Sequence, residues 1–276
     1  MIVCELQPYQ GLFSYLGAHG TLVAMAKIVI ANWKMNPVTP AEAKRIYAGT
    51  VKGATKLRGV HVSVCPPFVF LPELAKGTSK KVTLGVQDVF YEEDGAYTGQ
   101  TSPKMAKGYK AKLAIVGHSE RRALGESNEL VGRKARHAIE VGMTAVLCVG
   151  ERERNEEGEY YTFIKDELEA ALIGLKRKDL DKLIIAYEPI WAIGKRAEEA
   201  LDTRSLFEMV LFIRKVLTER FGRAPADRVP ILYGGSVKAE NAGTFITEGG
   251  VDGLLVGSAS LDPKQFTQIL TAAAAA

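Results

Sequence analysis

Four polar residues with the chemistry to bind or transform a small anion each follow a short apolar run. Asn32 and Lys34 follow the first run, His118 follows the fourth and Glu188 follows the sixth. Pro189 comes directly after Glu188. Proline cannot donate to a strand ladder and keeps the preceding residue extended, so the carboxylate should project from a strand end. A carboxylate, an imidazole and an ammonium group together suit general acid–base catalysis with charge stabilisation.

Each of these residues could instead have a purely structural role. Glu188 could cap a helix or form a salt bridge, and His118 could be a solvated turn residue. Lys34 could extend from a strand end to solvent, and Asn32 could form a turn. The catalytic interpretation depends on whether the fold brings the four strand ends together.

Eight apolar runs of strand length alternate with helical patterns, spaced about 32 residues apart. This alternation predicts parallel strands with helical crossovers, and eight of them suit a single-domain (β/α)8 TIM barrel over residues 25–271. The carboxyl ends of its strands would share one face. A doubly wound open sheet is the alternative, but it needs a glycine-rich turn after the first strand, where the chain reads NWKMN. The expected strands are 27–32, 60–65, 83–86, 112–116, 144–149, 183–187, 229–233 and 253–256.

Helix signals lie between these runs. Thr39 is the expected N-cap of a helix that begins at Pro40. Residues 156–175 should form a helix with Phe163 on its apolar face, and residues 203–221 should form another.

Glycine-rich turns follow the seventh and eighth strands, as YGGSV at 233–237 and VGS at 256–258. Either could be only a tight turn. Barrels, however, commonly bind phosphate at these two positions through backbone N–H groups. Together the turns predict a phosphate site that includes Ser236, Gly257 and Ser258.

Length and composition restrict the class of protein. The chain has 276 residues with 47% hydrophobic content, and 36 basic against 32 acidic residues, which argues against a nucleic-acid partner. Three scattered cysteines argue against zinc or disulfides and for a cytoplasmic location. No apolar run approaches the roughly 18 residues that span a membrane.

Both ends of the chain should lie outside the barrel. Residues 1–24 contain no Lys or Arg, so they fit neither a secretory signal nor a transit peptide. We expect a disordered tail, a cloning remnant or the product of an upstream start codon. Residues 272–276 are all alanine and are expected to be a tail without functional information.

Six motifs lie at or just after the expected strands. They are NWKMN at 32–36, GHSERR at 117–122, LCVGE at 147–151, YEPIWAIG at 187–194, YGGSV at 233–237 and LVGSASL at 255–261. In order and spacing they resemble the motifs of the triosephosphate isomerase family. The resemblance covers residues 26–270, and six motifs in register are far more specific than any one of them.

The resemblance implies an isomerase that interconverts dihydroxyacetone phosphate and D-glyceraldehyde 3-phosphate through an enediolate, with no cofactor and no metal. Glu188 resembles the base that removes a proton from the carbon next to the carbonyl. His118 resembles the neutral imidazole that polarises the carbonyl, its pKa lowered in that family by the N-terminus of a helix. Here Ser119 and Glu120 would begin that helix and complete the catalytic set.

The remaining roles implied by the resemblance concern charge and phosphate. Lys34 would stabilise the negative charge of the enediolate and the phosphate, and Asn32 would hydrogen-bond the substrate oxygens. Glu120 would either exchange protons or pair with Lys34. Backbone N–H groups of Gly194, Ser236, Gly257 and Ser258 would bind the phosphate.

The resemblance also implies a lid and a homodimer. The lid would close over the phosphate and exclude water. Thr98, in the long segment 86–103, would reach the active site of a second copy. Cys148 and Glu151 would support the base, and the Tyr233 hydroxyl would contact the closed lid. The lid residues are Pro189, Ile190, Trp191, Ala192, Ile193 and Gly194.

Three departures from the family pattern stand out. The family's lid continues after its first glycine with a threonine, a second glycine and a lysine, but this chain reads Gly194-Lys195-Arg196. Gln100 replaces a glutamate that pairs with the arginine matching Arg121, and the segment 122–126 is one residue short. None of these changes touches Asn32, Lys34, His118 or Glu188.

Two other functions fit a phosphate-binding barrel. One is a different phosphosugar enzyme, such as a Schiff-base aldolase or a metal-dependent epimerase, but the sixth strand offers only Lys182 before its start and the four histidines are scattered. The other is a non-catalytic phosphate-binding protein descended from such an enzyme.

Overall fold

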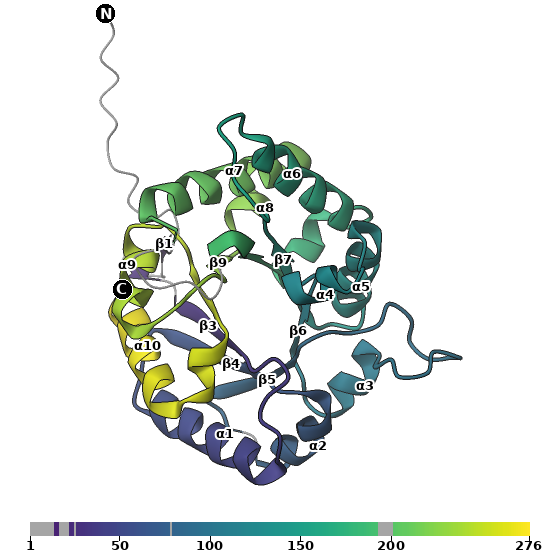
Figure 1. Ribbon diagram of the computed structural model, residues 1–276, viewed down its shortest axis with the longest axis vertical. Coiled ribbons are helices and arrows are strands. Elements are labelled where there is room, and N and C mark those ends of the chain that lie inside the picture. Colours follow the sequence, from purple (N-terminus) through teal and green to yellow (C-terminus); the bar gives the residue numbers. More distant parts are fainter. Residues whose placement is uncertain (1–13, 17–21, 25, 78, 193–200) are drawn as a thin grey trace, which may run out of the picture.

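The computed structural model describes residues 14–16, 22–24, 26–77, 79–192 and 201–276. Within them, eight parallel strands close into a barrel surrounded by helices, which confirms the single-domain (β/α)8 fold (Figure 1). Each strand pairs with the next along the chain, and the last pairs with the first. The strands are β3 (Lys27–Asn32), β4 (Val60–Cys65), β5 (Val82–Val86), β6 (Leu113–Val116), β7 (Thr144–Val149), β8 (Leu183–Tyr187), β9 (Ile231–Tyr233) and β10 (Gly253–Val256).

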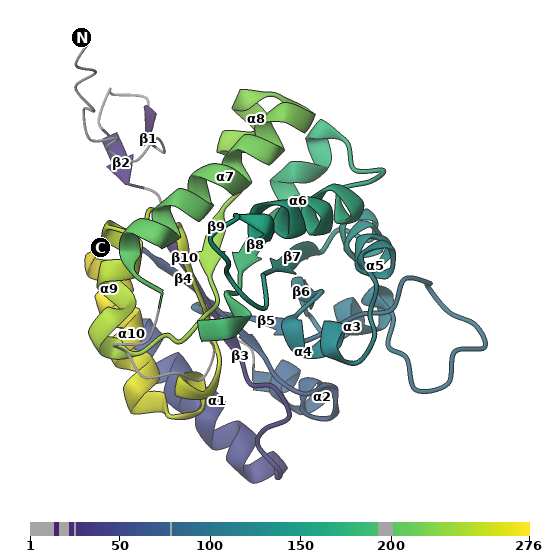
Figure 2. The same cartoon turned by 45° about the horizontal axis from the view of Figure 1, so that its top comes forward.

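The helices form a layer around the barrel, which Figure 2 shows from a second direction. In the described part of the chain, no helix combines the length and the apolar character needed to cross a membrane. The α-helices are α1 (Pro40–Thr55), α2 (Leu71–Leu74), α3 (Pro103–Gly108), α4 (Ser119–Ala123), α5 (Asn128–Glu140), α6 (Glu159–Ala171), α7 (Thr203–Phe221), α8 (Arg223–Asp227), α9 (Ala239–Thr247) and α10 (Pro263–Ala275). Short 3-10 turns are η1 (Phe68–Phe70), η2 (Ala75–Gly77), η3 (Arg177–Lys182), η4 (Ile190–Ala192) and η6 (Ser258–Leu261).

The two-residue repeat of the strands decides which side chains reach the barrel interior. On β8, Ile184 and Ala186 belong to the interior cluster, which also contains Ile30 of β3. The intervening residues of both strands pack in the larger cluster between barrel and helices. Continuing the alternation by two residues aims Glu188 and Asn32 inward at the carboxyl end of the barrel.

Most helix boundaries follow their sequence signals. The Thr39 hydroxyl caps α1 by accepting a hydrogen bond from the Glu42 backbone N–H at 3.3 Å, and α7 spans the expected residues. Helix α6 is shorter than residues 156–175, because it begins after Gly158 and ends at Ala171. Phe163 is 43% exposed, so its expected position on the buried face of α6 is wrong.

Both chain ends contain secondary structure that the sequence did not predict. Within residues 1–24, β1 (Ser14–Leu16) and β2 (Leu22–Ala24) form an antiparallel pair. The rest of that segment lies outside the described residues. Helix α10 continues to Ala275, and Ala273 is fully buried. The terminal alanines therefore belong to the last helix of the barrel and do not form a separate tail.

Candidate functional site

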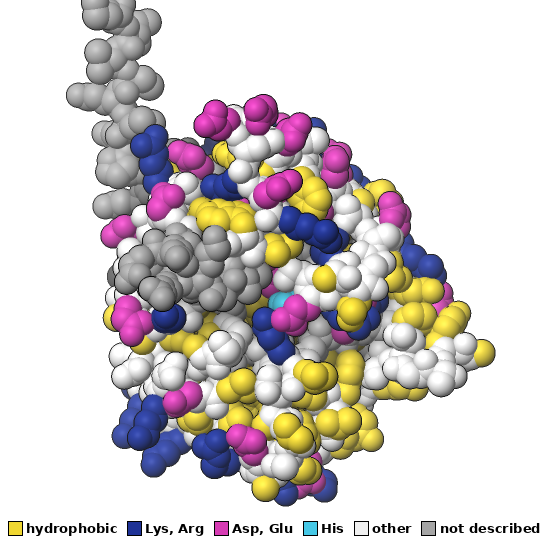
Figure 3. Space-filling view, in the orientation of Figure 1, with side chains coloured by type: hydrophobic (Ala, Val, Ile, Leu, Met, Phe, Trp, Pro, Cys, Tyr) yellow, Lys and Arg dark blue, Asp and Glu magenta, His cyan; other side chains and the backbone are white. Residues whose placement is uncertain are grey.

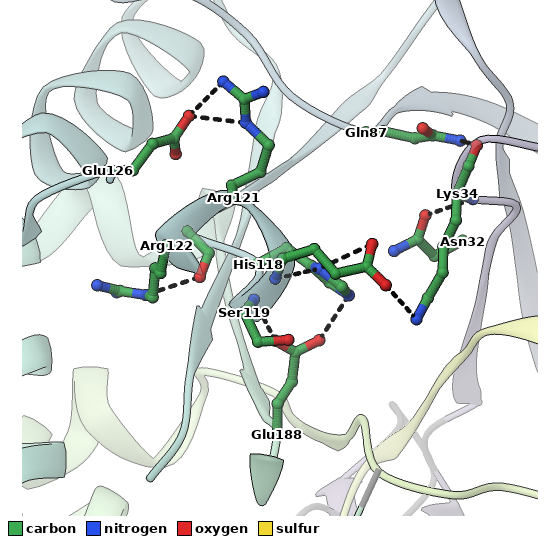
Figure 4. Close-up of polar contacts among 11 residues, drawn as sticks. Asn32, Lys34, Gln87, His118, Ser119, Arg121, Arg122, Glu126 and Glu188 are labelled. Carbon is green, nitrogen blue, oxygen red and sulfur yellow. Dashed lines mark hydrogen bonds and ion pairs between the residues drawn. The ribbon is translucent and has the colours of Figure 1, made fainter. Parts of the chain in front are cut away.

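Strand β3 ends at Asn32 and leads directly into Lys34. Lys34 has φ +53°, a left-handed conformation that is rare for residues other than glycine. Two contacts hold this turn: the Lys34 backbone N–H donates to Asn32 Oδ1 at 3.1 Å, and Gln87 Nε2 donates to the Lys34 carbonyl at 2.8 Å. The strained turn directs the Lys34 ammonium toward the centre of the site (Figure 4).

His118 lies two residues beyond the end of β6. Gly117 has φ +69°, and this left-handed residue turns the chain so that His118 becomes the N-cap of α4. The His118 Nδ1 atom accepts a hydrogen bond from the Glu120 backbone N–H at 3.2 Å. A nitrogen that accepts carries no proton, so in the neutral ring the proton lies on Nε2, which faces Glu188.

Glu188 is 1% exposed and its carboxylate meets His118 directly. Its Oε1 lies 3.1 Å from His118 Nε2, and its Oε2 accepts a hydrogen bond from the Ser119 backbone N–H at 3.0 Å (Figure 4). The backbone N–H of Glu188 donates to the Val149 carbonyl at 2.8 Å, which fixes the residue against the end of β7. Ser119 thus takes part through its backbone N–H.

Lys34 and Glu120 form the second charged pair of the site. Lys34 Nζ lies 2.7 Å from Glu120 Oε1, and the Glu120 side chain is 57% exposed. Of the two roles that the sequence left open for Glu120, pairing with Lys34 is the one this arrangement contains. At this exposure the pair orients the ammonium more than it stabilises the fold.

The pKa of His118 is raised in this arrangement. Burial by itself lowers it, but the Glu188 carboxylate and, less strongly, Glu120 raise it by a larger total. The direction is opposite to the lowering expected from a helix N-terminus, because the carboxylate is in direct contact with the ring. Protonation at Nδ1 would also break the hydrogen bond from the Glu120 N–H, which opposes the charged form.

These groups surround one cavity of about 620 Å³ at the carboxyl end of the barrel. A histidine side chain is visible beside basic and acidic side chains near the centre of this face (Figure 3). The fold therefore brings together most of the residues that the sequence singled out. Those lining the cavity are Asn32, Lys34, His118, Glu188, Ser236, Gly257 and Ser258.

The beginning of the expected lid is hydrogen-bonded to the Glu151 side chain. Trp191 Nε1 and the Tyr187 hydroxyl both donate to Glu151 Oε1, at 2.9 and 2.7 Å, and Arg154 Nε donates to the same oxygen at 2.9 Å. Residues 189–192 form the turn η4 and its approach. Ile193, Gly194 and the altered positions Lys195 and Arg196 lie outside the described residues.

Two further positions of interest behave differently from the core of the site. Thr98 does not line the cavity of its own chain but lies in the segment that extends beyond the helices between β5 and α3 (Figure 1). Burial raises the pKa of the Cys148 thiol well above its ordinary value, so it suits support rather than reaction.

Sequence reasoning missed three supporting side chains: Gln87, Arg122 and Glu167. Gln87 lies in a long polar segment without a distinguishing pattern, and Glu167 lies on a helix that carries several other charged residues. Arg122 was part of a recognised motif, which could have flagged it. For metals, no group of three or more His, Cys, Asp or Glu side chains within the described ranges is placed to hold an ion.

The comparison with known proteins agrees with the fold. The family model described as triosephosphate isomerase matches residues 27–273. A triosephosphate isomerase from Symbiobacterium thermophilum is 42% identical over 252 residues, covering 90% of this chain and 97% of that protein. One from Dehalococcoides mccartyi is 41% identical over 255 residues, covering 91% of this chain and 98% of the relative. The chain therefore belongs to the triosephosphate isomerase family.

Proposed function

We propose that this chain interconverts dihydroxyacetone phosphate and D-glyceraldehyde 3-phosphate without a cofactor. The observation that carries the proposal is the contact between His118 Nε2 and Glu188 Oε1, 3.1 Å apart in a cavity that Lys34 also lines. A base, a proton donor and a cation within reach of one small molecule are what an aldose–ketose isomerisation needs.

Glu188 is the base of the proposed reaction. Its carboxylate removes a proton from the carbon next to the substrate carbonyl and returns it to the neighbouring carbon. In the present arrangement the carboxylate is bound to the Ser119 N–H and to His118. A substrate carbonyl that takes over the His118 Nε2–H would release one of these contacts and free the carboxylate to approach carbon.

His118 and Lys34 stabilise the charge that develops on oxygen. The Nε2–H of His118 donates to the carbonyl oxygen and then transfers protons between the two oxygens of the enediolate. The Lys34 ammonium, oriented by Glu120, offsets the negative charge, and the Asn32 amide binds the substrate oxygens. These groups are positioned before the substrate arrives, so little reorganisation accompanies the reaction.

The phosphate end of the substrate is assigned to the turns after β9 and β10. Ser236, Gly257 and Ser258 line the same cavity, and the turn η6 begins at Ser258. Gly194 completes this set in the proposal. The lid from Pro189 to Gly194 would close over the phosphate and protect the enediolate from losing it to water.

We further propose that the protein acts in the cytoplasm as a homodimer, with Thr98 reaching the site of the second copy. Support comes from large apolar side chains that are strongly exposed, among them Met35, Val69, Met105 and Leu124. Hydrophobic side chains gather on the lower right of the face in Figure 3. Sedimentation velocity should give twice the 30.0 kDa of one chain, and a monomer at micromolar concentration would contradict the dimer.

The test of the activity is a dehydrogenase-coupled isomerase assay on the purified chain and on Glu188→Asp. The shorter side chain withdraws the carboxylate by roughly 1.5 Å, the length of one C–C bond. We expect kcat to fall by at least about 100-fold with KM changed only a few-fold, because positioning and not binding is lost. Glu219→Asp, on the exposed face of α7, is the matched control. Undiminished turnover in Glu188→Asp would reject the base assignment, and an inactive wild-type chain would reject the function.

A further inference from the structure

A buried arginine and glutamate connect the end of β6, which precedes His118, to the end of β7, which supports Glu188. Arg122, on α4, and Glu167, on α6, pair through Arg122 Nη1 and Glu167 Oε1 at 3.2 Å. Their side chains are 9% and 3% exposed, so the pair is screened from solvent. Neither residue lines the catalytic cavity.

The arginine binds two backbone carbonyls at the ends of adjacent strands. Arg122 Nε donates to the Gly117 carbonyl at 2.8 Å, one residue before His118. Its Nη2 donates to the Cys148 carbonyl of β7 at 3.3 Å, and its Nη1 also donates to the Asn128 side chain. A planar guanidinium bonded at three nitrogens fixes these groups relative to one another.

The glutamate fixes the backbone against which Glu188 rests. Glu167 Oε2 accepts a hydrogen bond from the Gly150 N–H at 2.8 Å. A Cβ atom at Gly150 would lie 1.8 Å from the Glu188 carbonyl oxygen, so these two backbones are in direct contact. Val149, the preceding residue, accepts the Glu188 N–H.

We propose that the ionised Arg122–Glu167 pair is a positioning device that sets the separation of His118 and Glu188. This inference rests on the proposed isomerase function. The pair reaches His118 through Gly117 and reaches Glu188 through Gly150. Loss of the carboxylate charge would weaken both the hydrogen bond to Gly150 and the attraction to Arg122.

The ionisation of Glu167 falls in a range where an assay can follow it. Burial raises the pKa of Glu167 to about 7, although Arg122 and the Gly150 N–H lower it, and Glu188 and Glu151 add to the rise. The Glu167 charge also contributes to the raised pKa of the Cys148 thiol of β7. Glu167 is therefore mostly neutral below that pH and mostly ionised above it.

The test compares kcat of Glu167→Gln with that of wild type across pH, using saturating substrate. Glutamine resembles the protonated glutamate. The ratio of mutant to wild-type kcat should be near one at about pH 5.5 and fall about tenfold or more by about pH 8, with KM within about twofold. Titrations shared by both proteins cancel in the ratio. Glu169→Gln, an exposed residue on the same helix, should give a ratio near one throughout.

Each other outcome overturns the inference. A ratio of one at every pH would mean that the pair does not position the site. A lowered ratio that does not change with pH would mean a structural role only. Arg122→Lys, which keeps the charge but cannot bind both carbonyls, is the second variant should Glu167→Gln fail to fold, and full kcat in it would also contradict the inference. An active wild type with a flat ratio rejects only this inference, whereas an inactive wild type rejects the proposed function.

Discussion

His118 Nε2 lies 3.1 Å from Glu188 Oε1, and both side chains are almost completely buried. The carboxylate therefore raises the pKa of the imidazole. The imidazole stays near its neutral form only while the carboxylate charge beside it is compensated or moved. In the proposed reaction the substrate separates the two groups, and this separation is what allows one to act as base and the other as proton donor.

The first prediction concerns the pKa of His118. Glu188→Gln removes the carboxylate that raises this pKa, so the pKa should fall, and burial should then take it below the ordinary value. A raised histidine pKa contributes stability below about pH 6.5 that is lost as the pH rises through the folded pKa, and the variant should lack this contribution. Nitrogen NMR titration of the imidazole measures the change. Glu120→Gln should lower the pKa less, and an unchanged pKa in Glu188→Gln would contradict the prediction.

The second prediction concerns the contact between Gly150 and Glu188. Gly150→Ala introduces a methyl group 1.8 Å from the Glu188 carbonyl oxygen and 2.6 Å from its carbon, both of them backbone atoms. The backbone must shift, so kcat should fall about tenfold or more and unfolding should become easier by about 1 to 3 kcal/mol. Gly108→Ala is the control, because nothing lies within 4 Å of a Cβ there. If Gly150→Ala and Gly108→Ala had the same kcat in the assay and the same free energy of unfolding in urea, the contact between Gly150 and Glu188 would not have the proposed importance.

The fold and the centre of the site were predictable because their signals are local. Buried strands and helix caps have short-range patterns, and parallel strands bring their carboxyl ends to one face whatever lies between them. Asn32, His118 and Glu188 all occupy such ends. Three residues with no strand in common could thus be assigned to one cavity from the chain alone.

The supporting contacts were not predictable because they depend on tertiary geometry. Gln87 reaches the Lys34 carbonyl across 53 positions of the chain, and no sequence pattern marks that pairing. The terminal alanines show no alternation of apolar and polar residues, so their sequence does not indicate which side of a helix is buried. In the structure Ala273 continues the buried face of α10. The raised pKa of His118 likewise follows from a contact that only the folded chain contains.

The third prediction concerns a buried charge cluster on the outer side of the barrel. Lys134 is 2% exposed and donates to both carboxylate oxygens of Asp88 at 2.8 Å and to Glu126. Lys134→Met removes the ammonium, so the Arg121 guanidinium is left to balance the negative charges of Asp88 and Glu126. The free energy of unfolding should fall by about 3 to 5 kcal/mol near pH 7.

The loss in Lys134→Met should shrink toward about pH 5. Burial already raises the pKa of Asp88, and removing the ammonium raises it further, so protonation relieves the variant as the pH falls. Urea unfolding at one protein concentration and two pH values measures this. Lys104→Met, which removes an exposed partner of Glu93, should change the free energy of unfolding far less at either pH, because water screens this pair. A loss in Lys134→Met that does not depend on pH would contradict the explanation.

The fourth prediction concerns the stability cost of keeping Glu167 ionised. Its folded pKa of about 7 is raised from the ordinary 4.5, chiefly by burial. A carboxyl group with a raised pKa binds its proton more tightly in the folded state, so its contribution to stability is largest below the unfolded pKa and is lost as the pH rises through the folded one. Glu167→Gln stays neutral and escapes this loss. The free energy of unfolding of Glu167→Gln minus that of wild type should therefore increase by about 2 to 3 kcal/mol between about pH 5 and pH 8.

Urea unfolding of both proteins at a fixed concentration across this range tests the prediction, with Glu169→Gln as the variant that should show no such trend. A constant difference between Glu167→Gln and wild type would mean that Glu167 does not titrate near neutral pH in the folded chain. If the gain occurs, the pH range in which the glutamine variant becomes relatively more stable is the range in which it should lose kcat. Opposite changes from one ionisation would identify Glu167 as a residue kept for function at the expense of stability.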